Sequence, residues 1–187
     1  MSDPLAHAAV RTLAIVAMLV VLARNLAGVR GRRTLAATGW QYVWLLYLVD
    51  YTLVWRHPVV IDAPAWYDVA LRPFGLALML AGIALVAWAY ATMGGYWSAS
   101  ISMRDDHRLV QAGPFALVRH PVYAGFLLGL FGGALALADP LVALAAIASV
   151  PIMRGRAFAE ERFLETRLGD AYRDYRRRVR MFVPGLF

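Results

Sequence analysis

The stretch Leu109–Gly125, which reads LVQAGPFALVRHPVYAG, lies between two strongly apolar segments and organises the chain. Arg119 and His120 precede Pro121 near its end, where a new apolar run begins. Proline suits the first position of a helix and favours an extended residue before it. Charged side chains beside a hydrocarbon-length helix are costly to place and usually have a function. We therefore expect an extended His120, a helix from Pro121, and a site between this stretch and Arg154–Arg180.

The composition places the chain in a membrane. Its 187 residues are 61% hydrophobic and 17% charged, with a mean hydropathy of +0.57. Crossing a hydrocarbon core of about 30 Å takes about 20 helical residues, and several apolar runs approach that length. The sequence therefore predicts an all-α integral membrane protein, with a single membrane domain over residues 1–187.

The charge pattern argues against nucleic acid as a partner. The formal net charge is +7 and all 19 basic residues are arginine, a bias that in membrane proteins is typical of cytosolic anchoring. There is no cysteine, which excludes disulfides, thiolate nucleophiles and cysteine metal sites, and we expect no metal site. The N-terminus lacks a basic region and a small-residue cleavage site, so we expect no cleaved signal.

We expect about five transmembrane helices. The fifth has only 13 residues and contains Pro151, so it is expected to be kinked or to cross only partly. Asp139–Pro140 is the predicted turn before it, and Arg56–Pro73 is expected to be an outer interfacial loop. The predicted spans are Leu5–Ala27, Thr38–Trp55, Phe74–Met93, Val122–Ala138 and Leu141–Met153. We assign the first three spans to residues 1–93 and the catalytic region to residues 94–187.

The distribution of arginine sets the predicted orientation. The arginines of residues 30–33, 104–119 and 154–180 fall on one side of a five-span chain, and the positive-inside rule makes that side cytosolic. The N-terminus is then outside and the C-terminus cytosolic, with Arg154–Arg180 forming a cytosolic helix broken near Gly169. In the outer half, Arg11 and Asp50 each lie about 9 Å from the ends of their spans, so we expect them to pair or share water.

Several polar motifs occur in a fixed order over roughly residues 94–183. They are Trp97–Ser98, His107, LVxxGPF from Leu109, RHPVYAG from Arg119, Glu160–Glu161, and LGDAYRDYRRRV from Leu168. This ordered set resembles the isoprenylcysteine carboxyl methyltransferase family, whereas one RHP alone would carry little weight. The resemblance implies a membrane enzyme that binds S-adenosylmethionine near the cytosolic face and methylates the carboxylate of a prenylated or lipid-like acceptor.

The resemblance also implies roles for single residues. Arg156 would face the substrate, and either Glu160 or Glu161 would hold a polar part of the cofactor. Phe115 stands where the family often has tyrosine, and Ser100 where a longer polar side chain contacts the cofactor in eukaryotic members. The implied cofactor-binding set is Ser100, His107, Arg108, Leu109, Val110, Phe115, His120, Pro121, Val122 and Tyr123, together with the glutamates.

The chemistry suits these residue types. Methyl transfer from a sulfonium is an in-line displacement, and a carboxylate acceptor is already ionised, so the enzyme mainly aligns the two reactants and removes water. The planar fork of an arginine can hold a carboxylate in one orientation.

The same residues also have a purely structural interpretation. Arg156 and Glu160 could form only a surface i,i+4 pair contributing about 0.3–0.5 kcal/mol. Adjacent glutamates point about 100° apart on a helix, so we expect one in the pocket and the other in solvent.

Three other functions stay open. N-methylation of a phospholipid amine would need a base, a role open to Glu160 or Glu161. A sterol-type membrane reductase would bind NADPH through several arginines, but the charged tract Arg104–Arg108 offers two arginines together with two aspartates. A membrane scaffold would leave the ordered motifs unexplained. The sequence leaves the acceptor unidentified.

Overall fold

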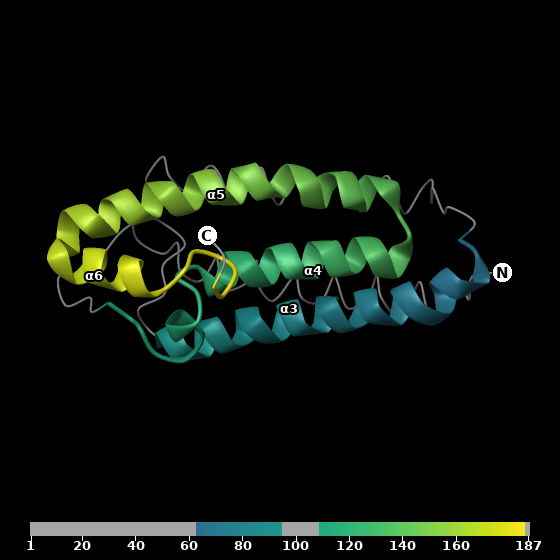
Figure 1. Ribbon diagram of the computed structural model, residues 1–187, viewed down its shortest axis with the longest axis horizontal. Helices are drawn as coiled ribbons and strands as arrows, with labels where there is room; N and C mark the ends of the chain where they lie inside the picture. The colour runs from purple at the N-terminus through teal and green to yellow at the C-terminus, as the bar shows by residue number, and fades with distance from the viewer. Residues whose placement is uncertain (1–62, 95–108, 186–187) are drawn as a thin grey trace.

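The structure of the protein is a computed structural model, which describes residues 63–94 and 109–185. Three long helices lie side by side and run in alternating directions, and a short helix folds back at one end (Figure 1). They are α3 (Arg72–Met93), α4 (Pro121–Leu137), α5 (Pro140–Leu168) and α6 (Asp170–Arg178). Within the described ranges no strand forms beyond one isolated bridge, so the helical fold class is confirmed. The first two predicted spans, the arginines at 30–33 and the Arg11–Asp50 pair lie outside these ranges.

The chain enters α3 earlier than expected. The predicted loop Arg56–Pro73 is wrong in its second half, because a π-helix, Tyr67–Leu71, leads directly into α3. Pro73 does not interrupt the helical segment, and it lies in the first turn of α3, directly after the π-helical turn. The helical segment Tyr67–Met93 has 27 residues and is long and apolar enough to cross a membrane.

Glycines bring α3 and α4 into close contact. A Cβ built on Gly75 would lie 2.7 Å from the carbonyl oxygen of Gly132, and one built on Gly82 would lie 2.5 Å from that of Gly125. Both distances are too short for a real side chain, so only glycine permits this approach. Small residues at helix contacts are the usual means of close packing in membranes. These contacts position α4, and with it the beginning of the predicted site, against α3.

The α4–α5 hairpin confirms some predictions and corrects another. Helix α4 begins at Pro121, as predicted, and Ala138 ends it in the left-handed region with φ 53°. Helix α5 then starts at Pro140 and continues for 29 residues, with Pro151 inside it. The prediction of a separate 13-residue span ending at Met153 is therefore wrong, because the hydropathy changes there while the helix continues.

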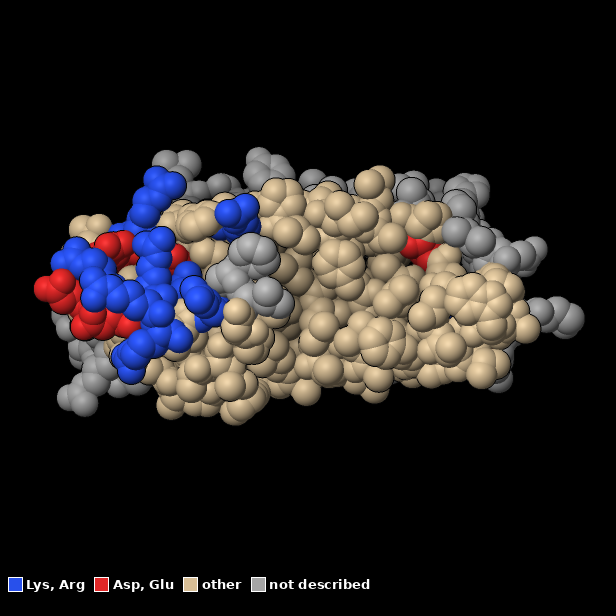
Figure 2. Space-filling view, in the orientation of Figure 1, with Lys and Arg blue, Asp and Glu red and all other residues tan. Residues whose placement is uncertain are grey.

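Helix α5 thus joins an apolar half to a charged half. Its segment Val142–Leu168 is the second helix of the described chain with the length and composition to cross a membrane, whereas α4 is shorter. The number of spans in the whole chain and its orientation stay predictions. The charged half ends at Gly169, where φ is 55°, and this break was predicted. Basic and acidic side chains gather at this end of the molecule, over α6 and the end of α5, while apolar and uncharged residues dominate the remaining visible surface (Figure 2).

Candidate active site

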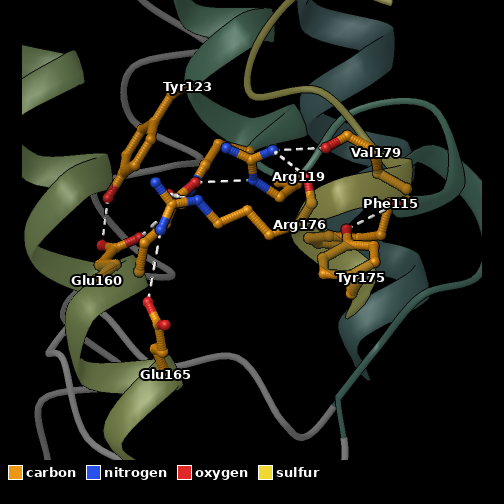
Figure 3. A network of polar contacts seen from close by, with 10 residues as sticks. Phe115, Arg119, Tyr123, Glu160, Glu165, Tyr175, Arg176 and Val179 are labelled. Carbon is orange, nitrogen blue, oxygen red and sulfur yellow. Dashed lines mark hydrogen bonds and ion pairs between the residues drawn. The ribbon is translucent and has the colours of Figure 1, made fainter. Parts of the chain in front are cut away.

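A polar network forms where the start of α4, the charged half of α5 and the end of α6 meet (Figure 3). Two neighbouring glutamates of α5 supply its negative charges. The loop before α4 supplies an arginine and a histidine, α4 supplies a tyrosine, and α5 and α6 each supply one further arginine. The residues are Arg119, His120, Tyr123, Arg156, Glu160, Glu161 and Arg176.

Glu161 is the buried centre of the network, with a side chain only 2% exposed. Its Oε1 accepts a hydrogen bond from Arg119 Nε at 2.8 Å and lies 3.1 Å from His120 Nε2. Its Oε2 lies 3.5 Å from Arg176 Nε as an ion pair, yet it is buried and has no hydrogen-bond partner. A buried carboxylate is costly unless its charge and lone pairs are satisfied. One oxygen of Glu161 is therefore satisfied and the other is left incomplete.

Glu160 lies on the more open side, with its side chain 25% exposed. Its Oε1 accepts a short hydrogen bond from the hydroxyl of Tyr123 and lies 3.4 Å from Arg156 Nε. Arg156 Nε also donates to the Tyr123 hydroxyl at 2.8 Å. Arg156 therefore does more than pair with Glu160 along the surface of α5, because its contact with Tyr123 also links α5 to α4.

His120 lies between the two carboxylates. Its Nε2 faces Glu161, and its Nδ1 is 3.6 Å from Glu160 Oε2. The ring stacks on Tyr123 with 5.5 Å between centroids. Burial alone would lower the pKa of His120, but its hydrogen bonds with Glu160 and Glu161 outweigh burial, and the pKa is raised. The site therefore favours the imidazolium form.

The expectation that one glutamate would point into solvent is wrong. Adjacent residues do diverge by about 100° on a helix, but His120 presents a nitrogen to each carboxylate and bridges that angle. Neither side chain is mostly exposed: 25% for Glu160 and 2% for Glu161.

Other predicted residues lie around the network or outside the described chain. Leu109 and Val110 are partly buried, Pro121 is buried in the first turn of α4, and Val122 packs against α3 beside Val86 and Tyr90. The carbonyl of Phe115 accepts a hydrogen bond from Tyr175 at 2.7 Å. The turn at Gly113–Pro114 is present as a short 3-10 helix, Gly113–Ala116. Ser100, His107 and Arg108 lie outside the described residues.

Two residues of the network, Arg119 and Arg176, were not among the predicted site residues. Arg119 adjoins His120 in the RHP motif, and its side chain is only 7% exposed. A basic residue next to a predicted site histidine, in a chain with two adjacent glutamates, was the available signal. Arg176 gave no such signal, because it is one of three consecutive arginines of α6.

Comparison with known proteins supports the motif analysis. Residues 75–166 match the model of the isoprenylcysteine carboxyl methyltransferase (ICMT) family. The predicted resemblance is confirmed. This segment runs from the start of α3 to the end of α5 and contains Arg119, His120, Tyr123 and both glutamates.

Curated relatives and a solved structure agree with this match. The chain is 34% identical to the cobalt-zinc-cadmium resistance protein CzcN of Cupriavidus metallidurans, over 65% of the chain and 54% of that protein. It is 33% identical to protein-S-isoprenylcysteine O-methyltransferase B of Arabidopsis thaliana, over 59% of the chain and 58% of that protein. The chain thus spans somewhat more than half the length of these relatives. A eukaryotic intramembrane Ras methyltransferase ICMT aligns with a TM-score of 0.61 and 25% identity, covering 78% of this chain and 52% of that one. The described helices therefore have an ICMT-like membrane fold.

Proposed function

We propose that the protein transfers a methyl group from S-adenosylmethionine to the carboxylate of a hydrophobic, prenylcysteine-like acceptor at the membrane interface. The observation that carries the proposal is the buried Glu161, held by Arg119 and His120 at the charged end of an apolar helix bundle. Glu161 lies within the segment that matches the ICMT family. A polar cofactor and a bilayer-soluble acceptor can meet only where these two environments adjoin.

The residues of the network fit the proposed cofactor. The Oε2 atom of Glu161 is buried without a hydrogen-bond donor, and S-adenosylmethionine carries an ammonium group and two ribose hydroxyls that can donate. Glu160 offers a second, partly exposed carboxylate. When bound, the cofactor supplies a methyl group on a positively charged sulfur. We assign its binding to His120–Tyr123 and the glutamates, with Leu109, Val110 and Phe115 beside them and Ser100, His107 and Arg108 from the adjoining segment.

The charge of the network favours an anionic acceptor. Three arginines and a histidine with a raised pKa face Glu160 and Glu161, and Arg176 also pairs with Glu165, so four positive charges meet three negative ones. A carboxylate entering this site gains an attraction that a phospholipid ammonium would not. We assign its orientation to Arg156, whose 3.4 Å contact with Glu160 is weak enough for an acceptor carboxylate to compete with it. No base is required, because the acceptor is already ionised.

We also propose the placement of the site in the cell. The charged end of the bundle (Figure 2) is assigned to the cytosol, where S-adenosylmethionine is available, with five spans and the N-terminus outside. The division into residues 1–93 and a catalytic region 94–187 belongs to the same proposal. Reporter fusions at residues 1 and 187 should report opposite compartments, and the same compartment for both would contradict the count of five.

The function is tested on the purified protein in detergent. S-adenosylhomocysteine should bind and raise the midpoint of thermal unfolding, because a ligand of the native state stabilises by mass action. Tritiated methyl from S-adenosylmethionine should appear as a base-labile ester on N-acetyl-S-farnesylcysteine. Phosphatidylethanolamine, as an amine acceptor, should remain unlabelled. A midpoint that responds to NADPH and not to S-adenosylhomocysteine would overturn the methyltransferase proposal in favour of a reductase.

A further inference from the structure

The segment that follows α6 returns to the site and pairs with its backbone. We call Val179–Phe182 the C-terminal strap. The amide of Arg119 donates to the carbonyl of Arg180 at 2.7 Å, and the amide of His120 donates to the carbonyl of Met181 at 3.1 Å. These bonds flank a parallel bridge between Val118 and Arg180. The strap therefore satisfies the backbone donors of Arg119 and His120, the two residues that contact Oε1 of Glu161.

Side chains attach the strap to the same place. Met181 is buried in a cluster with Tyr123, Met153 and Ala157. The ring of Phe182 packs edge-on against His120, with 6.1 Å between the ring centroids. His120 is thus enclosed by Tyr123 on one side and by the strap on another.

Arg119 connects the strap to the buried carboxylate. While its Nε donates to Glu161, its terminal nitrogen donates to the carbonyls of Val179 at 2.5 Å and Arg176 at 3.2 Å. These carbonyls lie at the end of α6, where helices leave carbonyl groups without intrahelical partners. The side chain of Arg119 therefore joins the loop, α5 and the strap through one guanidinium group.

A second tie holds α6 against the turn before the site. The hydroxyl of Tyr175 donates to the carbonyl of Phe115 at 2.7 Å. Burial raises the pKa of Tyr175 to about 12, so the hydroxyl keeps its proton and remains a donor. The chain from α6 into the strap is therefore held at two places in the loop before α4, at Phe115 and at Arg119–His120.

We propose that the C-terminal strap is a positioning element of the site, which sets Arg119 and His120 against Glu161. The strap lies beyond residues 75–166, the segment that matches the model of the ICMT family. Arg119 and His120 precede α4, and although the carbonyl of His120 accepts from the amide of Ala124, their own amides would lack these acceptors without the strap. Misplacement of a site by about 1 Å can cost about 10²-fold in rate. The inference rests on the proposed function, in which His120 and Glu161 bind the cofactor.

The test replaces Phe182 and compares it with its neighbour. Phe182→Ala removes the ring from His120, whereas Val183→Ala changes a side chain that is 47% exposed. We expect Phe182→Ala to raise the Kd for S-adenosylhomocysteine and the KM for S-adenosylmethionine at least tenfold, with the KM for the acceptor changed less than twofold. Val183→Ala should stay within twofold of wild type. Phe182→Tyr, which keeps the ring, should recover affinity to within threefold.

The split between the two KM values separates positioning from loss of folded protein. A merely destabilised variant loses active molecules, which lowers the apparent kcat and leaves Kd and both KM values unchanged. That pattern, or a Kd for Phe182→Ala equal to that of wild type, would overturn the positioning role of the strap while leaving the proposed function intact. A wild-type protein that binds no S-adenosylhomocysteine would overturn the function instead. Hydrogen exchange at the amides of Arg119 and His120 would then test the positioning role of the strap. Equal protection of these amides in Phe182→Ala and wild type would overturn that role.

Discussion

A polar cluster lies at each end of helix α4, and the two clusters differ in their contacts. At its C-terminal end, the Tyr67 hydroxyl donates to the carbonyl of Leu135 at 2.8 Å, and Arg72 donates to the carbonyl of Ala136 at 2.7 Å. Arg72 also pairs with Asp68 at 2.7 Å. This outer cluster supplies side-chain donors to carbonyls in the last turn of α4, where the carbonyl of Leu135 also accepts a long bond from the amide of Ala138, at 3.4 Å.

The inner cluster surrounds Glu161 at the other end of α4. It consists mainly of charged side chains, whereas the outer cluster mainly caps a helix. Its central carboxylate is buried, with Oε2 lacking a hydrogen bond, and its cations outnumber its anions. In the outer cluster, the two bonds to α4 go to neutral carbonyl groups, and the carboxylate of Asp68 is 41% exposed. Charge beside a membrane helix is therefore not by itself evidence of a site. Buried charge with an incomplete set of partners is the feature that indicates a ligand.

The largest effect is expected from Glu161→Ala, compared with Arg72→Ala. Removing one partner of a buried ion pair costs about 3–5 kcal/mol, and here Arg119 loses its carboxylate partner while His120 loses one of its two. Arg72→Ala removes bonds to a neutral carbonyl and a partly exposed carboxylate, and should cost about 1–3 kcal/mol. Thermal unfolding with and without S-adenosylhomocysteine measures both. The ligand should stabilise Arg72→Ala as it does wild type and leave Glu161→Ala unaffected; an equal shift in both variants would make the inner cluster structural as well.

Arg156→Ala should reduce turnover about 10²-fold while leaving the Kd for S-adenosylhomocysteine within about threefold, because orientation of the acceptor contributes terms of that size. Arg156→Lys should recover activity only partly, since a point charge cannot grip a carboxylate with two parallel bonds. The readout is methyl transfer to N-acetyl-S-farnesylcysteine alongside calorimetry. Full turnover of Arg156→Ala on every acceptor tried would remove the support for a carboxylate acceptor and favour an amine.

The pH dependence of stability should distinguish the two ends of α4. The pKa of His120 is raised in the folded protein, so its stabilisation is complete below the unfolded value of about 6.5 and is lost as pH rises through the folded pKa. The titratable groups in contact with His120 are Glu160, Glu161 and Tyr123, and Arg119 shares Glu161 with it; carboxylates, tyrosine and arginine ordinarily titrate outside this window. The free energy of unfolding should fall by at most about 1.4 kcal/mol per pH unit above pH 6.5.

Denaturant unfolding from pH 6 to pH 9 would measure this slope in wild type, His120→Gln and Arg72→Ala. We expect the slope to disappear in His120→Gln and to persist in Arg72→Ala. A wild-type protein whose stability is flat over this range would show that His120 is not held as a cation.

Much of the backbone could be predicted because single residues decide it. Pro121 starts α4, Asp139–Pro140 separates α4 from α5, and Gly169 breaks the chain before α6. Each of these is a local effect of proline or glycine on the dihedral angles. The continuation of α5 past Met153 could not be predicted in the same way, because a change from apolar to charged residues marks the boundary of a membrane and does not mean that a helix stops there. Pro151 added to the error, since α5 continues through it.

The site was predictable in its residue types and less so in its geometry. The motifs led to His120, Tyr123 and both glutamates, which the structure brings together. That both carboxylates turn inward depends on the position of a ring on another helix, which no spacing along α5 encodes. The strap was missed for a similar reason, because two main-chain bonds between segments about 60 residues apart leave no periodic pattern in the sequence.

The smallest effect is expected from Asp68→Asn in the outer cluster. Asp68 and Arg72 form an i,i+4 pair with exposed fractions of 41% and 17%, and such pairs contribute about 0.3–0.5 kcal/mol. Asparagine keeps an oxygen that can accept from Arg72, and the bond from Arg72 to Ala136 does not involve Asp68. The midpoint of thermal unfolding should therefore change by no more than about 2 °C, with methyl transfer unchanged. The matched change at the inner cluster, Glu161→Gln, also keeps an oxygen but leaves two buried cations without a full negative charge, so it should weaken cofactor binding at least tenfold. If Asp68→Asn proved as damaging as Glu161→Gln, exposure would not separate the two clusters, and the outer one would have to be considered a second site.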